Sequence, residues 1–183
     1  MVKAKKRWAK RIAAVALACA LGTGAVGALV GCSSDSKSNS DEMSVAWTSN
    51  AGEYNLDPTN NYMGWQGSYL GIYEQLFRID ANFDPQPMLA ESAEMVNDTT
   101  WKITIREGVT FQNGNELNAQ AVADCLNRTI SMNERAKKSL DIANMEADGN
   151  VLTVTTNSLN TAFKNELSEP VASIIDVNSG AAE

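Results

Sequence analysis

The 183-residue sequence contains no histidine, and it has only three cysteines and four prolines. Without histidine, Ser-His-Asp and Cys-His nucleophilic catalysis are excluded, together with histidine general bases and every zinc site that has a histidine ligand. The composition, 44% hydrophobic and 20% charged, is that of a globular chain rather than a disordered or fibrous one. We therefore expect no catalytic residue, no metal site and no cofactor.

Acidic residues are missing from the start of the chain. The first is Asp35, whereas six of the fifteen Lys and Arg residues lie within the first eleven positions. From Cys32 onward, nine basic residues stand against 22 acidic ones, which leaves this part with a formal charge of −13. A body of that charge repels a phosphate backbone, so nucleic acid is excluded as a partner. The basic head on an acidic body is typical of a targeting segment.

The head has the organisation of a signal peptide. An apolar run of small residues, 12–30, follows the basic stretch, and residues 29–32 (LVGC) resemble the sites at which bacterial lipoproteins are cleaved and acylated. We predict that residues 1–31 are removed and that the Cys32 thiol carries a diacylglycerol, which anchors the protein to the outer side of the cell membrane. The alternative is a transmembrane helix, because the run approaches the roughly 20 residues that span a bilayer. Four glycines weaken that helix, and no basic cluster follows it (Gly22, Gly24, Gly27, Gly31).

Residues 32–44 are polar and serine-rich, and we predict a flexible tether there. Only Cys125 then remains in the folded body, so no intrachain disulfide is expected. It shares a helical face with Val122 and Leu126, which predicts a buried thiol rather than a nucleophile.

The body, residues 45–183, alternates strand and helix signals and predicts a mixed α/β fold. Residues 101–105 (WKITI) alternate apolar and polar side chains, and Asn118 stands where it would cap the following helix. Asp148-Gly149-Asn150 separates two arms of a hairpin. The expected elements are a strand at 45–47, a helix at 68–77, a turn or extended chain at 84–87, a strand at 101–105, a turn at 113–114, a helix at 119–129, a hairpin of 142–146 with 151–156, and a helix at 161–167.

Five short motifs, in this order, resemble the solute-binding proteins of bacterial ABC importers, in the peptide and nickel class known as family 5. They are residues 56–58 (LDP), 72–77 (IYEQLF), 87–92 (PMLAES), 100–111 (TWKITIREGVTF), and 113–114 (NG) followed by 117–122 (LNAQAV). Most of these residues also have a purely structural interpretation. Trp101, Ile103 and Phe111 suit a core, and Arg106 suits an ion pair with a carboxylate.

The resemblance implies a periplasmic-binding-protein type II fold, in which two lobes close around a ligand. The body would then be a truncated N-terminal lobe, because a second lobe does not follow it. The implied partners are an ABC permease and a small ligand, contacted in the loop after the first strand. The ligand candidates are Asn50, Tyr62, Met63 and Trp65. Together they offer an amide, two aromatic rings and a thioether to a ligand. The alternative role of Met63 and Trp65 is packing against the next helix.

Peptide is the expected ligand class. The last motif resembles the nickel branch, in which a basic residue after the proline helps to hold an anionic chelate, but Val171 follows Pro170 here and no histidine is present. A nickel chelate receptor stays open as the alternative, as does a truncated lipoprotein that works in adhesion or signalling. An extracellular carboxylate-pair glycosidase is disfavoured, because Glu91, Glu94 and Glu107 have no distinctive spacing.

Overall fold

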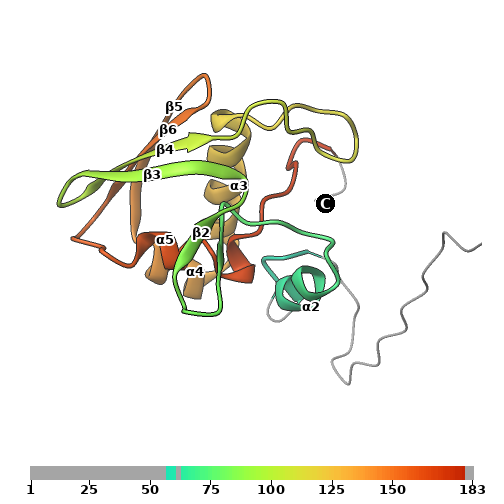
Figure 1. The fold of residues 1–183 in the computed structure, drawn as a ribbon, viewed down its shortest axis with the longest axis horizontal. Helices are drawn as coiled ribbons and strands as arrows, with labels where there is room; N and C mark the ends of the chain where they lie inside the picture. The colour runs from blue at the N-terminus through green and yellow to red at the C-terminus, as the bar shows by residue number, and fades with distance from the viewer. Residues whose placement is uncertain (1–56, 61–62, 180–183) are drawn as a thin grey trace, which may run out of the picture. The chain divides into compact units, whose positions relative to one another are not determined.

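The structure is a computed structural model that describes residues 57–60 and 63–179. The predicted signal peptide, the tether and the strand at 45–47 lie outside these residues. No helix in the described part of the chain has the length and apolar character needed to cross a membrane. The elements in chain order are α2 (Met63–Tyr69), β1 (Phe77–Ile79), β2 (Pro85–Pro87), β3 (Ala90–Asn97), β4 (Thr100–Ile105), α3 (Ala119–Met132), α4 (Glu134–Leu140), β5 (Ile142–Asp148), β6 (Val151–Thr156), α5 (Phe163–Glu166) and the 3-10 helix η1 (Pro170–Ala172) (Figure 1).

The main sheet has four antiparallel strands in the order β3-β4-β6-β5. Its centre is β4, whose alternating residues Trp101, Ile103 and Ile105 are all buried, as the sequence predicts. In the register with β6, Ile103 is paired with Leu152 and Trp101 with Val154, so the apolar side chains of both strands share one face. The predicted hairpin of β5 and β6 is confirmed, with the turn at residues 149–150.

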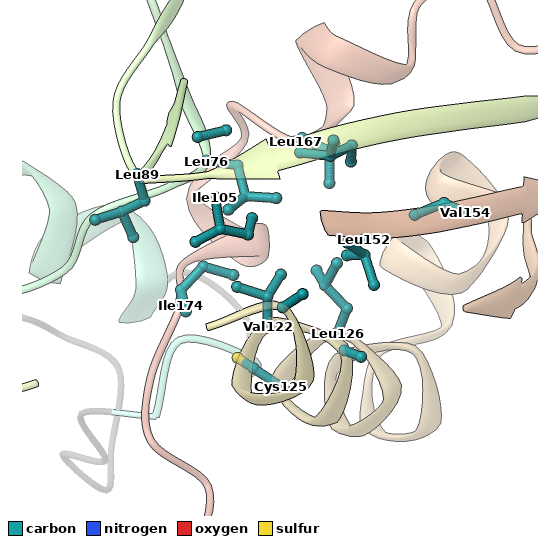
Figure 2. Packing of buried hydrophobic residues seen from close by; sticks show 14 of the residues in the cluster. Leu76, Leu89, Ile105, Val122, Cys125, Leu126, Leu152, Val154, Leu167 and Ile174 are labelled. Carbon is teal, nitrogen blue, oxygen red and sulfur yellow. The ribbon is translucent and has the colours of Figure 1, made fainter. Parts of the chain in front are cut away.

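The helix α3 covers this apolar face of the sheet. Its predicted N-cap is confirmed, because the Asn118 side chain accepts a hydrogen bond of 3.0 Å from the backbone N–H of Ala121. Val122 and Leu126 are fully buried between α3 and the sheet, where Leu152 and Ile105 also lie (Figure 2). Fully burying one such side chain contributes about 2 kcal/mol, so this layer is the main stabilising element of the fold.

The predicted helix at 68–77 is wrong. Helix α2 lies earlier and ends at Tyr69, which is 73% exposed, and Phe77 already starts β1. The physical reason is Gly71, which takes a left-handed φ of 70° just after the helix. The N–H of Gly71 donates to the Ser68 carbonyl and that of Ile72 to the Gly67 carbonyl, which is the hydrogen-bond pattern that closes a helix at a glycine.

The other segment predictions that fall within the described residues agree with the structure. Residues 85–87 are extended in β2, which pairs with β1, and Asn113-Gly114 forms a turn closed by a bridge between Thr110 and Glu116. A helix also forms within 161–167, although it is limited to α5. The expected ion pair of Arg106 is not found among the described residues: its Nε donates to the Met88 carbonyl at 3.1 Å, so it ties the end of β4 to the chain that precedes β3.

Candidate functional site

A cavity of about 840 Å³ opens beside α3, away from the four-stranded sheet. Four segments form most of its lining: the turn at 57–58, the chain between α2 and β1 at 71–74, the loop at 109–113, and the C-terminal segment at 174–179. Leu89, Leu117 and, from α3, Arg128 and Met132 complete it. About half of the lining side chains are apolar, including Ile72, Phe111 and Ile174, and most of the others are polar or charged. This composition is that of a cleft that can accept an amphipathic molecule or a polypeptide segment.

An ion pair between Asp57 and Arg128 forms one end of the cavity. The Arg128 guanidinium donates from Nη1 to Oδ1 at 3.1 Å and from Nη2 to Oδ2 at 2.5 Å, and the side chains are only 15% and 13% exposed. Asp57 Oδ1 also accepts hydrogen bonds from the N–H and hydroxyl of Thr59. Burial by itself would raise the pKa of Asp57, but the hydrogen bonds from Arg128 and Thr59 outweigh it and hold that pKa below its usual value.

This pair fixes the turn at 57–60 to the C-terminal half of α3. Asn133, which caps α4, also donates from Nδ2 to the Thr59 carbonyl at 2.9 Å. Tyr73 packs nearby, and its ring lies so close to α2 that a β-carbon at Gly67 would be 2.0 Å from the ring. Burial and the charge of Asp57 raise the pKa of Tyr73, so its hydroxyl stays protonated at neutral pH.

The opposite wall of the cavity is held by Asp176. The amide nitrogens of Asn113 and Asn115 each donate to Asp176 Oδ2 at 2.7 Å, and the backbone N–H of Asn178 donates to Oδ1 at 2.9 Å. These bonds lower the pKa of Asp176 below its usual value. The contact joins the loop at 109–115 to the C-terminal segment, which is more than 60 residues away in the chain.

The C-terminal segment is tied to α2 and β1 by a second polar contact. Gln75 is buried, and its Nε2 donates to the hydroxyls of Ser68 at 2.7 Å and Ser173 at 2.9 Å. Next to it, the backbone N–H of Ile174 donates to the Glu74 carbonyl at 2.9 Å. These contacts hold residues 173–176 in an extended path along the cavity.

The predicted ligand residues are not brought together in the described part of the chain. Asn50 and Tyr62 lie outside it, as does Cys32, and Met63 is described only as the first residue of α2. Trp65 lies on α2 and is half-buried, with the Arg135 guanidinium of α4 at 6.0 Å from its ring centroid. It does not line the cavity. The role of these residues in binding therefore stays a prediction.

Sequence reasoning missed both polar contacts that hold the cavity walls. The Asn113-Gly114-Asn115 stretch indicates only a turn, and Asp176 lies in a region where its spacing to Asn113 carries no local signal. Asp57 belongs to one of the family motifs, but no feature of the sequence indicates its partner Arg128.

Cys125 lies behind the cavity and is chemically inert, as predicted. It is 2% exposed, and burial raises the pKa of its thiol to about 11. The sulfur instead takes part in packing the C-terminal segment, since it accepts a hydrogen bond from the Ile175 N–H at 3.4 Å. No cluster of three or more Cys, Asp or Glu side chains suited to a metal ion occurs within residues 57–60 and 63–179.

Comparison with known proteins assigns the chain to a family. Residues 84–183 match the family described as bacterial extracellular solute-binding proteins, family 5 Middle. The nickel-binding protein NikA of Staphylococcus aureus is 32% identical over 110 residues, which is 60% of this chain and 22% of that protein. Its structure in complex with Ni(L-His)2 superposes with a TM-score of 0.57 over 58% of this chain and 23% of that one.

Other relatives are named for glutathione or again for nickel. The glutathione-binding protein GsiB of Escherichia coli K12 is 32% identical over 109 residues, which is 57% of this chain and 21% of that protein. The crystal structure of a nickel ABC transporter protein from Bacillus halodurans is 40% identical, with a TM-score of 0.64 over 68% of this chain and 26% of that one.

These relatives are binding and transport proteins rather than enzymes, and the mixed α/β fold is shared with their structures. The chain spans about a fifth of the curated relatives that it matches, 22% of NikA and 21% of GsiB. Because the family match covers more than half of the sequence, this chain belongs to the bacterial extracellular solute-binding proteins of family 5.

Proposed function

We propose that this chain works in solute capture for an ABC importer on the outer side of the cell membrane, and hands its ligand to a permease. The observation that carries the proposal is the family match over residues 84–183, joined to 40% identity with a nickel transporter protein of the same fold.

The proposal includes a lipid anchor. Residues 1–31 act as the signal peptide, Cys32 takes the lipid, residues 32–44 form the tether, and residues 45–183 form the binding body. The support is the LVGC sequence at 29–32, with a basic and an apolar segment before it. Labelling of the chain with a radioactive fatty acid in a bacterial host tests this: the label should be lost in Cys32→Ser and kept in Cys19→Ser. Equal labelling of the two variants would contradict the anchor.

Peptide and nickel chelate are both supported as ligand classes. Glutathione, named for GsiB, is a tripeptide and favours a small peptide. NikA favours nickel, and the histidines of the Ni(L-His)2 complex bound to it belong to the ligand, so the lack of histidine in this chain does not exclude a chelate. Against the chelate, Val171 is 8% exposed and offers no charge to an anion. We propose a peptide, with a nickel complex of free amino acids as the second candidate.

The proposed contacts to the ligand are Asn50, Tyr62, Met63 and Trp65. The support is that Trp65 and Met63 belong to one short helix and that Trp65 is an aromatic residue, a type that can stack on a ligand. The Arg135 guanidinium lies over the Trp65 ring at 6.0 Å from its centroid, which favours one orientation of the ring.

Calorimetric titration of the full chain tests the function. The ligands are glutathione, a dipeptide mixture, Ni²⁺ with two equivalents of L-histidine, and Ni²⁺ alone. Binding of a peptide supports the first candidate, and binding of nickel only with histidine supports the second. Trp65→Leu should weaken the binding by about tenfold or more, whereas Tyr69→Leu, an exposed aromatic of the same helix, should not change it. If none of the four ligands produces a heat of binding, the proposal is overturned.

A further inference from the structure

The loop that forms one cavity wall contains the dipeptide Asn113-Gly114, and both residues are exposed. An asparagine followed by glycine is the pair in which the backbone nitrogen reaches the side-chain carbonyl most easily, because glycine has no side chain to hinder the approach. Here no heavy atom lies within 4 Å of the position that a β-carbon of Gly114 would take, so water also has free access. These are the conditions under which an asparagine side chain loses its amide group without an enzyme.

We propose that Asn113 is a site of spontaneous deamidation, that the contact of its loop with Asp176 controls the rate, and that the product releases this cavity wall. The proposal rests on the described geometry of residues 109–115 and 174–179. It is independent of which ligand the protein binds.

The reaction needs only water. The backbone nitrogen of Gly114 gives its proton to water and attacks Cγ of Asn113, so that a C–N bond forms. The Cγ–Nδ2 bond then breaks, and Nδ2 takes up a proton from water and leaves as ammonia. The result is a five-membered succinimide. Water then adds to one of the two ring carbonyl carbons, the bond from that carbon to the ring nitrogen breaks, and the product is either aspartate or isoaspartate. No oxidant or reductant takes part.

Three hydrogen bonds hold the pair in an unreactive arrangement while the loop is docked. Asn113 Nδ2 donates to Asp176 Oδ2 at 2.7 Å, and the N–H of Asn115 donates to Asn113 Oδ1 at 3.0 Å. The N–H of Gly114, the nucleophile of the first step, donates to the Phe111 carbonyl at 2.9 Å. Attack therefore requires that the loop first leaves Asp176, and the rate of deamidation reports how often it does so.

The product cannot dock as the amide does. Deamidation replaces the Nδ2 donor with a carboxylate oxygen, and this oxygen would face the Asp176 carboxylate at hydrogen-bond distance. Asp176 is ionised at neutral pH because its hydrogen bonds lower its pKa. Two like charges at that distance repel each other and act against the bond that Asn115 still donates to Asp176, which favours separation of the loop at 109–113 from the segment at 174–179. Both line the cavity, so one chemical event changes its shape permanently.

The rate is tested on the full chain, incubated at pH 8 and 37 °C and analysed by peptide mapping with mass spectrometry. Asn113 should gain one dalton faster than Asn157 or Asn178, two exposed asparagines that precede serine. Asp176→Ala should raise the rate at Asn113 by about tenfold, since it removes a charge-assisted bond. The control Asp98→Ala, which has the same charge change in the β3–β4 turn, should leave the rate unchanged. Equal rates in the Asp176 and Asp98 variants would overturn the proposal.

The consequence is tested by hydrogen exchange of residues 109–117. Asn113→Asp should speed exchange in this segment by about tenfold or more, and Asn113→Ala, which removes the donor without adding charge, should have a smaller effect. Circular dichroism shows whether the variants are folded. If Asp176→Ala does not fold, Asn115→Ala removes the neighbouring bond to the same carboxylate and should raise the deamidation rate in its place. Identical exchange in the Asp and Ala variants would refute the charge-based release.

Discussion

Replacing Arg128 by methionine should destabilise the chain by about 2–4 kcal/mol, the range for removing one partner of a largely buried, doubly hydrogen-bonded pair. Methionine preserves the apolar stem of arginine and its volume is close, so loss of packing is minor. The substitution takes the Arg128 cation away from the Asp57 carboxylate, which is only 13% exposed. Losing this ion pair and its two hydrogen bonds is the main source of the destabilisation.

The loss depends on pH in a defined direction. The pKa of Asp57 in the folded chain lies below the usual 3.8, so the pair contributes stability above that value and loses it as the pH falls from 3.8 toward the folded pKa. The difference between the native chain and Arg128→Met should therefore be complete at pH 6 and should shrink below pH 3.8.

Urea unfolding followed by circular dichroism measures this difference. The matched control is Arg78→Met, which removes the same charge from an exposed position on β1 and should change stability by less than about 0.5 kcal/mol. In the double variant Asp57→Asn/Arg128→Met, the two losses should not add, because both remove the same interaction. Equal effects of Arg128→Met and Arg78→Met, or a deficit that does not begin to shrink as the pH falls below 3.8, would refute the reasoning.

Three further outcomes are expected. Trp101 Nε1 is buried without a hydrogen-bond partner among the described residues, so Trp101→Phe should change the free energy of unfolding by less than about 1 kcal/mol, whereas Trp101→Ala should cost about 3–5 kcal/mol; thermal unfolding distinguishes them. Gly71→Ala should cost about 1–2 kcal/mol in the same assay and Gly71→Asn less, because asparagine tolerates the left-handed region. Iodoacetamide at pH 8, followed by peptide mapping, should modify Cys125 only in urea; modification of the native chain would contradict its burial.

Local signals in the sequence are sufficient for most of the secondary structure. The strict alternation in β4 can be satisfied only by a strand with one buried face, and the asparagine before α3 has a single obvious use as a cap. The failure at 68–77 has a local cause too. Apolar residues at helical spacing predict a helix there, but Gly71 lies among them, and its backbone freedom makes it a helix end that the spacing alone does not reveal.

The same local signals do not predict the cavity. Asp57 and Arg128 are 71 residues apart, and Asn113 and Asp176 are 63 residues apart, so neither contact leaves a periodic trace in the sequence. The residues of each pair come together only when α3 and the C-terminal segment have packed against the sheet. Motif resemblance identifies the family correctly, yet it places the ligand residues in a stretch that the described residues only partly include.

The two kinds of contact have different consequences for how the protein can move. Strands β4 and β6 are held by a continuous ladder of backbone bonds and a fully apolar layer, so they open only when the whole domain unfolds. The cavity walls are held by side-chain bonds to Asp57, Asp176 and Gln75 and by isolated backbone bonds, so one substitution or one deamidation can loosen part of them. A binding protein needs cavity walls that can adjust and a rigid support behind them. In this chain the strands joined by the backbone ladder are the rigid support, and the segments held by side-chain contacts are the adjustable walls.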